Sequence, residues 1–167
     1  MQNIARNLFG GLVLILIGTL LYLTVFSDGL GKAPAITVKT AQGQMLALNQ
    51  PMKPVMVTFW ATTCSGCIAE MPHLAKIKQQ FGDKFELVAV SMEYDPAEQV
   101  EKFTAKNPYP FSFVKDTDGK IASAFGKELL TPTSYLIAPN CNIKYRKVGE
   151  ADFDWITQVI DQMTPNL

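Results

Sequence analysis

Residues 55–72 read VMVTFWATTCSGCIAEMP, and they join two elements of regular structure through a pair of cysteines. The first six residues are mostly β-branched or aromatic, which is typical of a strand buried on both of its faces. Apolar residues then recur at helical spacing as far as Phe81, and Gly82 follows as a helix stop. The stretch therefore predicts a buried strand, a short turn and a helix that begins near Cys64.

Cys64 and Cys67 form a C-x-x-C motif at the start of the predicted helix. This position, directly after a buried strand, is typical of a redox dithiol. A zinc site would need two further ligands, and only Cys141 and the single His73 could supply another cysteine or histidine. A purely structural disulfide would close too small a loop to restrict the unfolded chain much. We therefore predict a redox-active pair, with no metal and no other cofactor.

The two cysteines have different expected roles. A thiolate at a helix N-terminus faces unpaired backbone N–H groups and the positive end of the helix dipole, so Cys64 is the expected nucleophile. Cys67 lies one helical turn further on and is expected to be less exposed. From there it can attack the mixed disulfide that Cys64 forms with a partner, which makes Cys67 the expected resolving residue.

The rest of the chain alternates between short strands and helices around this unit. Buried and alternating patterns predict strands at residues 36–39, 45–48, 55–60, 86–91, 111–114, 133–138 and 143–148, the first two as a hairpin. Helical spacing and end signals predict helices at residues 64–81, 96–106, 120–125 and 153–163. The pattern predicts an α/β domain with helices on both faces of a sheet.

The N-terminal region has a different character. Leu8 to Phe26 gives 19 mostly apolar residues without a charge, enough for a helix to cross a bilayer. This apolar core is longer than that of a cleavable secretory signal. Arg6 before the span, against Lys32 after it, favours an N-terminus inside the cell and an exported C-terminal part. We therefore predict an uncleaved transmembrane anchor and linker over residues 1–34 and one globular domain over residues 35–167.

Length and charge limit the classes of function. The chain has 167 residues, which suits one domain with a short appendage and excludes a multidomain enzyme. Lys and Arg together number 15, and Asp and Glu together also number 15. No net positive charge therefore attracts nucleic acid, and we expect no nucleic-acid partner.

Two motifs of a known protein family occur in this chain. Residues 60–72 match W-A-x-x-C-x-x-C-x-x-E-x-P, and residues 132–137 match P-T-x-x-[LF]-I far downstream. On these residues the chain resembles the membrane-anchored thioredoxin-like thiol-disulfide oxidoreductases of the TlpA/ResA type, over about residues 35–164. The resemblance implies a thioredoxin-like fold, with a central mixed β-sheet flanked by helices on both faces and preceded by one N-terminal transmembrane helix.

The resemblance also implies which residues bind the substrate. Pro132 would follow a cis peptide bond and face the dithiol, where the backbone of Thr131 can pair with an incoming chain by strand addition. Trp60 is the third residue that the resemblance places at the substrate. On the residues alone, Pro132 could instead start an edge strand.

Glu70 is the third expected catalytic residue. It follows Cys67 by three positions, so it lies near the same helix face and could exchange protons with the dithiol through water. The resemblance points the same way, although an exposed acid that complements the helix dipole is the alternative. This chain departs from its relatives at Thr58, where cytosolic thioredoxins have a buried carboxylate, and at Thr63 and Gly66, where many relatives have an aromatic residue and a proline.

The resemblance implies an enzyme that reduces disulfides of exported proteins such as apocytochrome c, with electrons from a membrane thiol carrier. It also implies a single-pass protein of the cytoplasmic membrane, with its C-terminal domain in the periplasm or on the extracytoplasmic side. Ser65 and Gly66 place no cation beside Cys64, so helix amides are its main source of thiolate stabilisation and we expect a reductant. Two alternatives stay open: an oxidant that donates disulfides, and a copper-binding or delivery module on the same fold.

Two further residues could bind or react. His73 would lie on the same helix as the dithiol, whereas copper chaperones of this fold have a histidine far along the chain, so we expect a solvated helix residue. Cys141 lies in a predicted hairpin turn and is an odd thiol in an exported domain. It is either reduced and inert or paired between chains.

Overall fold

The computed structural model describes residues 11, 15–19, 30–40, 43–126 and 129–165. Its centre is a sheet of strands in the order β5-β4-β3-β6-β7. These strands are β3 (Val55–Trp60), β4 (Glu86–Ser91), β5 (Ser112–Lys115), β6 (Thr133–Ile137) and β7 (Ile143–Val148). β3, β4 and β5 are parallel to one another, whereas β6 and β7 run antiparallel to their neighbours. The sheet is therefore mixed, as the resemblance implies.

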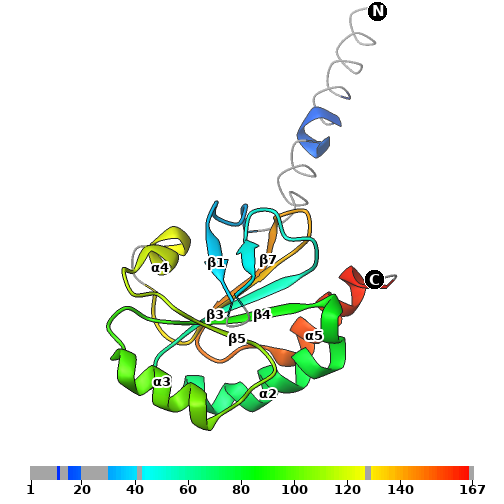
Figure 1. Ribbon diagram of the computed structural model, residues 1–167. Helices are drawn as coiled ribbons and strands as arrows, with labels where there is room; N and C mark the ends of the chain where they lie inside the picture. The colour runs from blue at the N-terminus through cyan, green and yellow to red at the C-terminus, as the bar shows by residue number, and fades with distance from the viewer. Residues whose placement is uncertain (1–10, 12–14, 20–29, 41–42, 127–128, 166–167) are drawn as a thin grey trace, which may run out of the picture.

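Helices cover one face of the sheet and contribute to the other. The helices are α2 (Ser65–Phe81), the short 3₁₀ helix η1 (Gly82–Lys84), α3 (Ala97–Lys106), α4 (Lys120–Phe125) and α5 (Phe153–Met163). α2, α3 and α5 lie on one face (Figure 1). On the other face lie α4 and a hairpin of β1 (Thr37–Lys39) and β2 (Met45–Ala47). The prediction of helices on both faces is confirmed, with the hairpin sharing the second face.

β3 supplies side chains to both faces. All six of its residues are buried, and alternate side chains point to opposite sides of the sheet. Met56 and Trp60 pack in the same core cluster as α2, α3 and α5. Val55, Val57 and Phe59 pack with α4 and the hairpin. Burial on both faces explains why this strand reads as a nearly continuous apolar run.

The observed elements start and end within one or two residues of the predicted bounds. Gly82 ends α2 with a φ of 53°, a conformation that favours glycine and explains its strength as a stop signal. Asp152 caps α5, because its carboxylate accepts a hydrogen bond from the Trp155 backbone N–H at 3.0 Å. Local signals of this kind therefore predicted the elements well.

Most of the predicted transmembrane span, residues 8–26, lies outside the described residues. Of that span, the structure describes residues 11 and 15–19, which are helical and exposed. Within the described part of the chain, no helix is long and apolar enough to cross a membrane.

The second half of the predicted linker is attached to the domain. The backbone N–H of Leu30 donates to the Ile143 carbonyl at 2.9 Å, and the N–H of Ala33 donates to the Cys141 carbonyl at 2.8 Å. Ala33 is also buried. Residues 30–33 of the predicted anchor and linker are therefore attached to the domain, because backbone groups of the β6–β7 turn and of the start of β7 pair with them. This contact lies beside the β6–β7 turn, at the opposite end of β6 from Pro132.

Candidate active site

Cys64 and Cys67 lie at the junction of β3 and α2. The chain turns after Trp60, and the Cys64 N–H donates to the Ala61 carbonyl at 3.0 Å. Cys64 then caps α2, because its sulfur accepts a hydrogen bond from the Cys67 backbone N–H at 3.2 Å. The two sulfurs are joined in a disulfide, and their Cα atoms are 5.3 Å apart. The structure therefore contains the oxidised form of the predicted dithiol.

Cys64 is the more accessible cysteine. It is half-buried, whereas Cys67 is only 2% exposed. The first turn of α2 contains no acidic side chain, so no carboxylate in that turn opposes the effect of the helix dipole on the Cys64 sulfur. An incoming sulfur therefore meets Cys64 first, which supports its expected role as nucleophile and that of Cys67 as resolving residue.

Pro132 lies against the cysteine loop. The Thr131–Pro132 peptide bond is cis, as the resemblance implies. A Cβ added at Gly66 would lie 3.9 Å from the Pro132 Cδ, so the proline ring is next to the C-x-x-C motif. The edge-strand alternative is wrong, because β6 starts at Thr133 and pairs with β3 on one side and β7 on the other.

Glu70 is buried near the dithiol. It is 4% exposed, and its carboxylate accepts a hydrogen bond from the Ala151 backbone N–H at 2.6 Å. It lines a cavity of about 270 Å³ together with Gly66, Ala69, His73, Pro132, Glu150 and Phe153. The alternative of an exposed acid in the first helical turn is therefore wrong. The carboxyl group shares a cavity with Gly66, which lies between the two cysteines, and with Pro132, which lies against Gly66.

Burial raises the pKa of Glu70, although the hydrogen bond from Ala151 acts in the opposite direction, and nearby Glu150 raises it further. The folded protein therefore binds this proton more tightly than the unfolded chain does. Its stabilising effect is present at acid pH and is lost as the pH rises from the ordinary carboxyl range through the folded-state pKa. Above that pKa the Glu70 carboxylate is charged while it stays buried.

As the pH rises from 4 to 8, we expect the free energy of unfolding of Glu70→Gln to increase relative to that of the parent protein. Glutamine keeps an oxygen for the Ala151 N–H but carries no charge. Urea unfolding midpoints at the two pH values measure the effect, and Glu101→Gln on the exposed surface of α3 is the control. A difference between Glu70→Gln and the parent that stays the same at both pH values would contradict this expectation.

Trp60 is not at the surface that the resemblance implies for it. The side chain is 1% exposed, and its ring packs against Phe103 at 5.0 Å and Phe113 at 5.4 Å between ring centroids. Position 60 is the last residue of β3 and points into the core cluster beneath α2 and α3. In this structure the Trp60 ring is enclosed by the core.

The structure also shows the surroundings of Thr58, His73 and Cys141. Thr58 is buried and accepts a hydrogen bond from the Ser134 hydroxyl at 3.0 Å, so a pair of hydroxyls fills the place of the carboxylate of cytosolic thioredoxins. His73 is exposed, with its ring 5.1 Å from that of Phe153. Cys141 is a free thiol in the β6–β7 turn. No group of three potential metal ligands occurs among the described residues.

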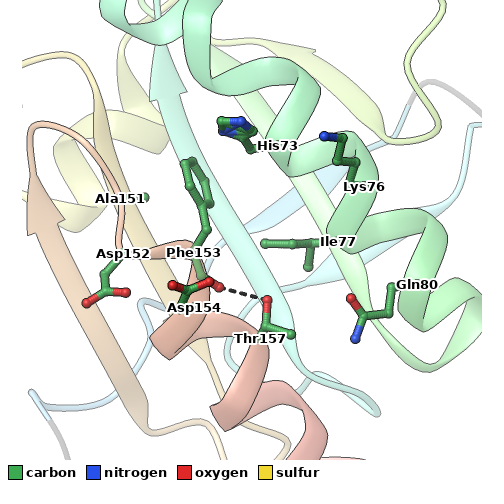
Figure 2. A pocket seen from close by; sticks show the side chains of 9 residues that line it. All are labelled: His73, Lys76, Ile77, Gln80, Ala151, Asp152, Phe153, Asp154 and Thr157. Carbon is green, nitrogen blue, oxygen red and sulfur yellow. Dashed lines mark hydrogen bonds between the residues drawn. The ribbon is translucent and has the colours of Figure 1, made fainter.

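A second groove lies between α2 and α5. Figure 2 shows its lining, which includes His73, Lys76 and Gln80 from α2 and Asp154 and Thr157 from α5. The groove has a volume of about 490 Å³, and neither Cys64 nor Cys67 is among its lining residues. It adjoins the Glu70 cavity, with which it shares His73 and Phe153.

The sequence missed contacts that join distant parts of the chain. Glu150 and Phe153 line the Glu70 cavity, and Asp95 bonds to Thr62 in the turn before Cys64. The local sequence correctly predicts a loop at Glu150 and helix starts at Phe153 and after Asp95. It gives no sign that these residues lie near the dithiol. Asp95 precedes Pro96 at a helix start, and that position alone suggests an ordinary cap.

A protein-family model described as the AhpC/TSA family matches residues 31–146. The chain belongs to this family. It is 31% identical to the thioredoxin-like protein YneN of Bacillus subtilis, over 78% of this chain and 77% of that one. It is 28% identical to the thiol-disulfide oxidoreductase ResA of Bacillus thuringiensis, over 96% and 98% of the two chains.

Solved structures agree with this assignment. The solution structure of a thioredoxin candidate from Neisseria meningitidis superposes with a TM-score of 0.70 and 33% sequence identity, over 83% of this chain and 93% of that one. The fold is therefore thioredoxin-like. With the Cys64–Cys67 pair in its place at the start of α2, this member of the AhpC/TSA family is a thiol-disulfide oxidoreductase.

Proposed function

We propose that this oxidoreductase reduces disulfides in exported partner proteins outside the cytoplasmic membrane, and that apocytochrome c is such a client. The observation that supports the proposal most is the half-buried Cys64 at the N-terminus of α2, joined to a buried Cys67 and flanked by Pro132. The thiol-disulfide oxidoreductase ResA of Bacillus thuringiensis matches 96% of this chain, and the proposal extends its kind of chemistry to this protein.

The reaction starts from the reduced dithiol. The Cys64 thiolate attacks one sulfur of the client disulfide, which breaks the client bond, forms a mixed disulfide and releases one client thiolate. Cys67 loses its proton and attacks the Cys64 sulfur. The second client thiolate then leaves, and the Cys64–Cys67 disulfide forms. Two electrons pass to the client, and a membrane thiol carrier returns two electrons to the enzyme.

One side chain and one backbone group assist the reaction in this proposal. Glu70, in the cavity beside Gly66 and Pro132, accepts the proton that Cys67 loses, directly or through water. The backbone of Thr131 binds the client chain in an extended form next to the cysteines. In Glu70→Gln, the pH dependence of thiol alkylation in the reduced protein is expected to shift, and an unchanged profile would leave Glu70 without a proton-transfer role.

Catalysed reduction tests the function directly. The full chain in detergent, supplied with dithiothreitol, is expected to accelerate reduction of insulin disulfides and to bind no stoichiometric copper when reduced. Stoichiometric copper binding without insulin reduction would favour the copper-delivery alternative. Faster oxidation of a reduced client than reduction of an oxidised one would favour the disulfide-donating alternative.

We also propose that residues 8–26 anchor the domain in the cytoplasmic membrane. Because residues 30–33 pair beside the β6–β7 turn, an anchor that precedes them would leave Pro132 and the dithiol at the far end of β6, away from the anchor. The mature protein is expected to stay in the membrane fraction after a carbonate wash and to keep its N-terminus. A soluble mature chain that starts near Ile36 would contradict this prediction.

A further inference from the structure

Asp95 carries a buried carboxylate that the reaction described above does not use. The residue follows β4 in the loop before α3 and is 2% exposed. Both of its carboxylate oxygens accept hydrogen bonds from Thr62. The Thr62 backbone N–H donates to Oδ2 at 2.6 Å, and the Thr62 hydroxyl donates to Oδ1 at 2.5 Å. Burying a carboxylate costs much free energy unless hydrogen-bond donors satisfy its oxygens. The two hydrogen bonds from Thr62 to Asp95 are therefore a specific contact.

Thr62 belongs to the turn that carries the reactive cysteine. That turn is closed by the hydrogen bond from the Cys64 N–H to the Ala61 carbonyl, and Thr62 is its second residue. The loop that contains Asp95 also contacts Trp60, the residue before the turn. The Met92 N–H in this loop donates a hydrogen bond to the Trp60 carbonyl at 3.0 Å. Asp95 therefore restrains the turn through one backbone bond and one side-chain bond.

We propose that Asp95 is a positioning residue for the dithiol: its carboxylate fixes the Ala61–Cys64 turn through Thr62 and holds a buried negative charge at that turn. The first effect keeps the Cys64 sulfur at the N-terminus of α2. The second effect opposes the helix dipole, because a nearby negative charge disfavours the Cys64 thiolate. Asp95 thus limits how acidic the nucleophile becomes, which suits a dithiol that gives electrons away.

Other ionisable groups surround the dithiol as well. Glu70 and His73 lie on α2, and Glu150 comes from the loop before α5, all three in the cavity next to Gly66. Lys147 on β7 acts electrostatically on Glu70. Glu93 lies in the same loop as Asp95 and is exposed. These groups stay in place when Asp95 alone is changed, so a substitution there isolates its contribution.

The size of the effect follows from Coulomb's law. At an effective dielectric constant of about 20, a unit charge roughly 10 to 20 Å from a thiol shifts the thiol's titration by roughly half to one pH unit. Asp95→Asn removes the charge but keeps both contacts, since the amide oxygen accepts from the Thr62 N–H and the amide N–H donates to the hydroxyl. Asp95→Ala removes the charge and the contacts together.

The test measures iodoacetamide alkylation of Cys64 against pH in the reduced full chain, with Cys141→Ser as background. We expect Asp95→Asn to lower the alkylation midpoint by about half to one pH unit. Asp95→Ala is expected to lower the midpoint and also to slow mixed-disulfide formation with a disulfide peptide at least a few-fold. This readout needs neither a client protein nor a particular redox direction, so it is independent of the proposed reductase function.

Asp116 supplies a matched control. It is 1% exposed and accepts hydrogen bonds from the backbone N–H groups of Ile121 and Ala122 at the start of α4, on the other face of the sheet. Asp116→Asn is expected to lower stability and leave the alkylation midpoint unchanged. An unchanged midpoint in Asp95→Asn, or an equal shift in Asp116→Asn, would overturn the proposal. Because Asp95→Asn keeps its contacts, it remains decisive even where Asp95→Ala does not fold.

Discussion

We expect Cys67→Ser to accumulate mixed disulfides between Cys64 and client proteins, whereas Cys64→Ser is expected to form none and to lose all turnover. The reason is the difference in position between the two sulfurs. Cys64 is half-buried at the helix N-terminus and reaches a client, while Cys67 is 2% exposed and reaches only the Cys64 sulfur. Without the resolving thiol, the covalent intermediate has no internal route to break down.

The measurement is non-reducing electrophoresis of variants trapped with acid. Cys141→Ser serves as the common background, because Cys141 is the remaining free thiol and could form adducts of its own. This background is expected to keep full activity, since Cys141 lies in the β6–β7 turn at the far end of β6 from Pro132. Equal trapping by the two active-site variants would remove the assigned roles.

Trp60→Ala is expected to lose about 3–5 kcal/mol of stability, which is the usual cost of removing a large aromatic side chain from a core. Trp60 is almost fully buried and packs between α2, α3 and the phenylalanines at 103 and 113. A loss of this size is a large part of the total stability of a small domain. Urea unfolding of the oxidised protein measures it.

Trp60→Phe tests whether Trp60 acts by packing in the core or by contacting the substrate. The Trp60 indole N–H has no hydrogen-bond partner among the described residues, so phenylalanine removes no such bond and leaves a ring in place. The variant is expected to be less destabilised than Trp60→Ala and to reduce insulin disulfides at close to the parental kcat/KM. A fall of tenfold or more in kcat/KM in a well-folded Trp60→Phe would instead support the substrate contact that the resemblance implies.

Local sequence signals predicted the framework because each is decided within a few residues. The apolar run of β3, the cysteines at a helix start and Gly82 at its end need only their neighbours to be interpreted. The cis bond before Pro132 required the family resemblance, since the residues alone also allowed an edge strand. Only the strand pairing of β6 on both sides excluded that alternative.

The surroundings of the site depend on long-range contacts, which a single sequence does not reveal. Glu70 is buried, and Ala151, 81 positions away, donates a hydrogen bond to its carboxylate. Asp95 is linked to Thr62 across 33 positions. Trp60 was expected at the substrate from its place in the motif, whereas the direction of its side chain is set by the pleat of β3. In each case tertiary packing determined what the residue does.

The central proposal is that this dithiol gives electrons to its partners. Its direction depends on how strongly the reduced form is stabilised, and here the helix amides act without a neighbouring cation in the Ser65–Gly66 pair, while Asp95 adds an opposing charge. The most direct measurement is the equilibrium reduction potential of the full chain in detergent, determined against a glutathione or dithiothreitol buffer. We predict a value near the thioredoxin level of about −270 mV, and a value above about −180 mV would contradict the reductase function.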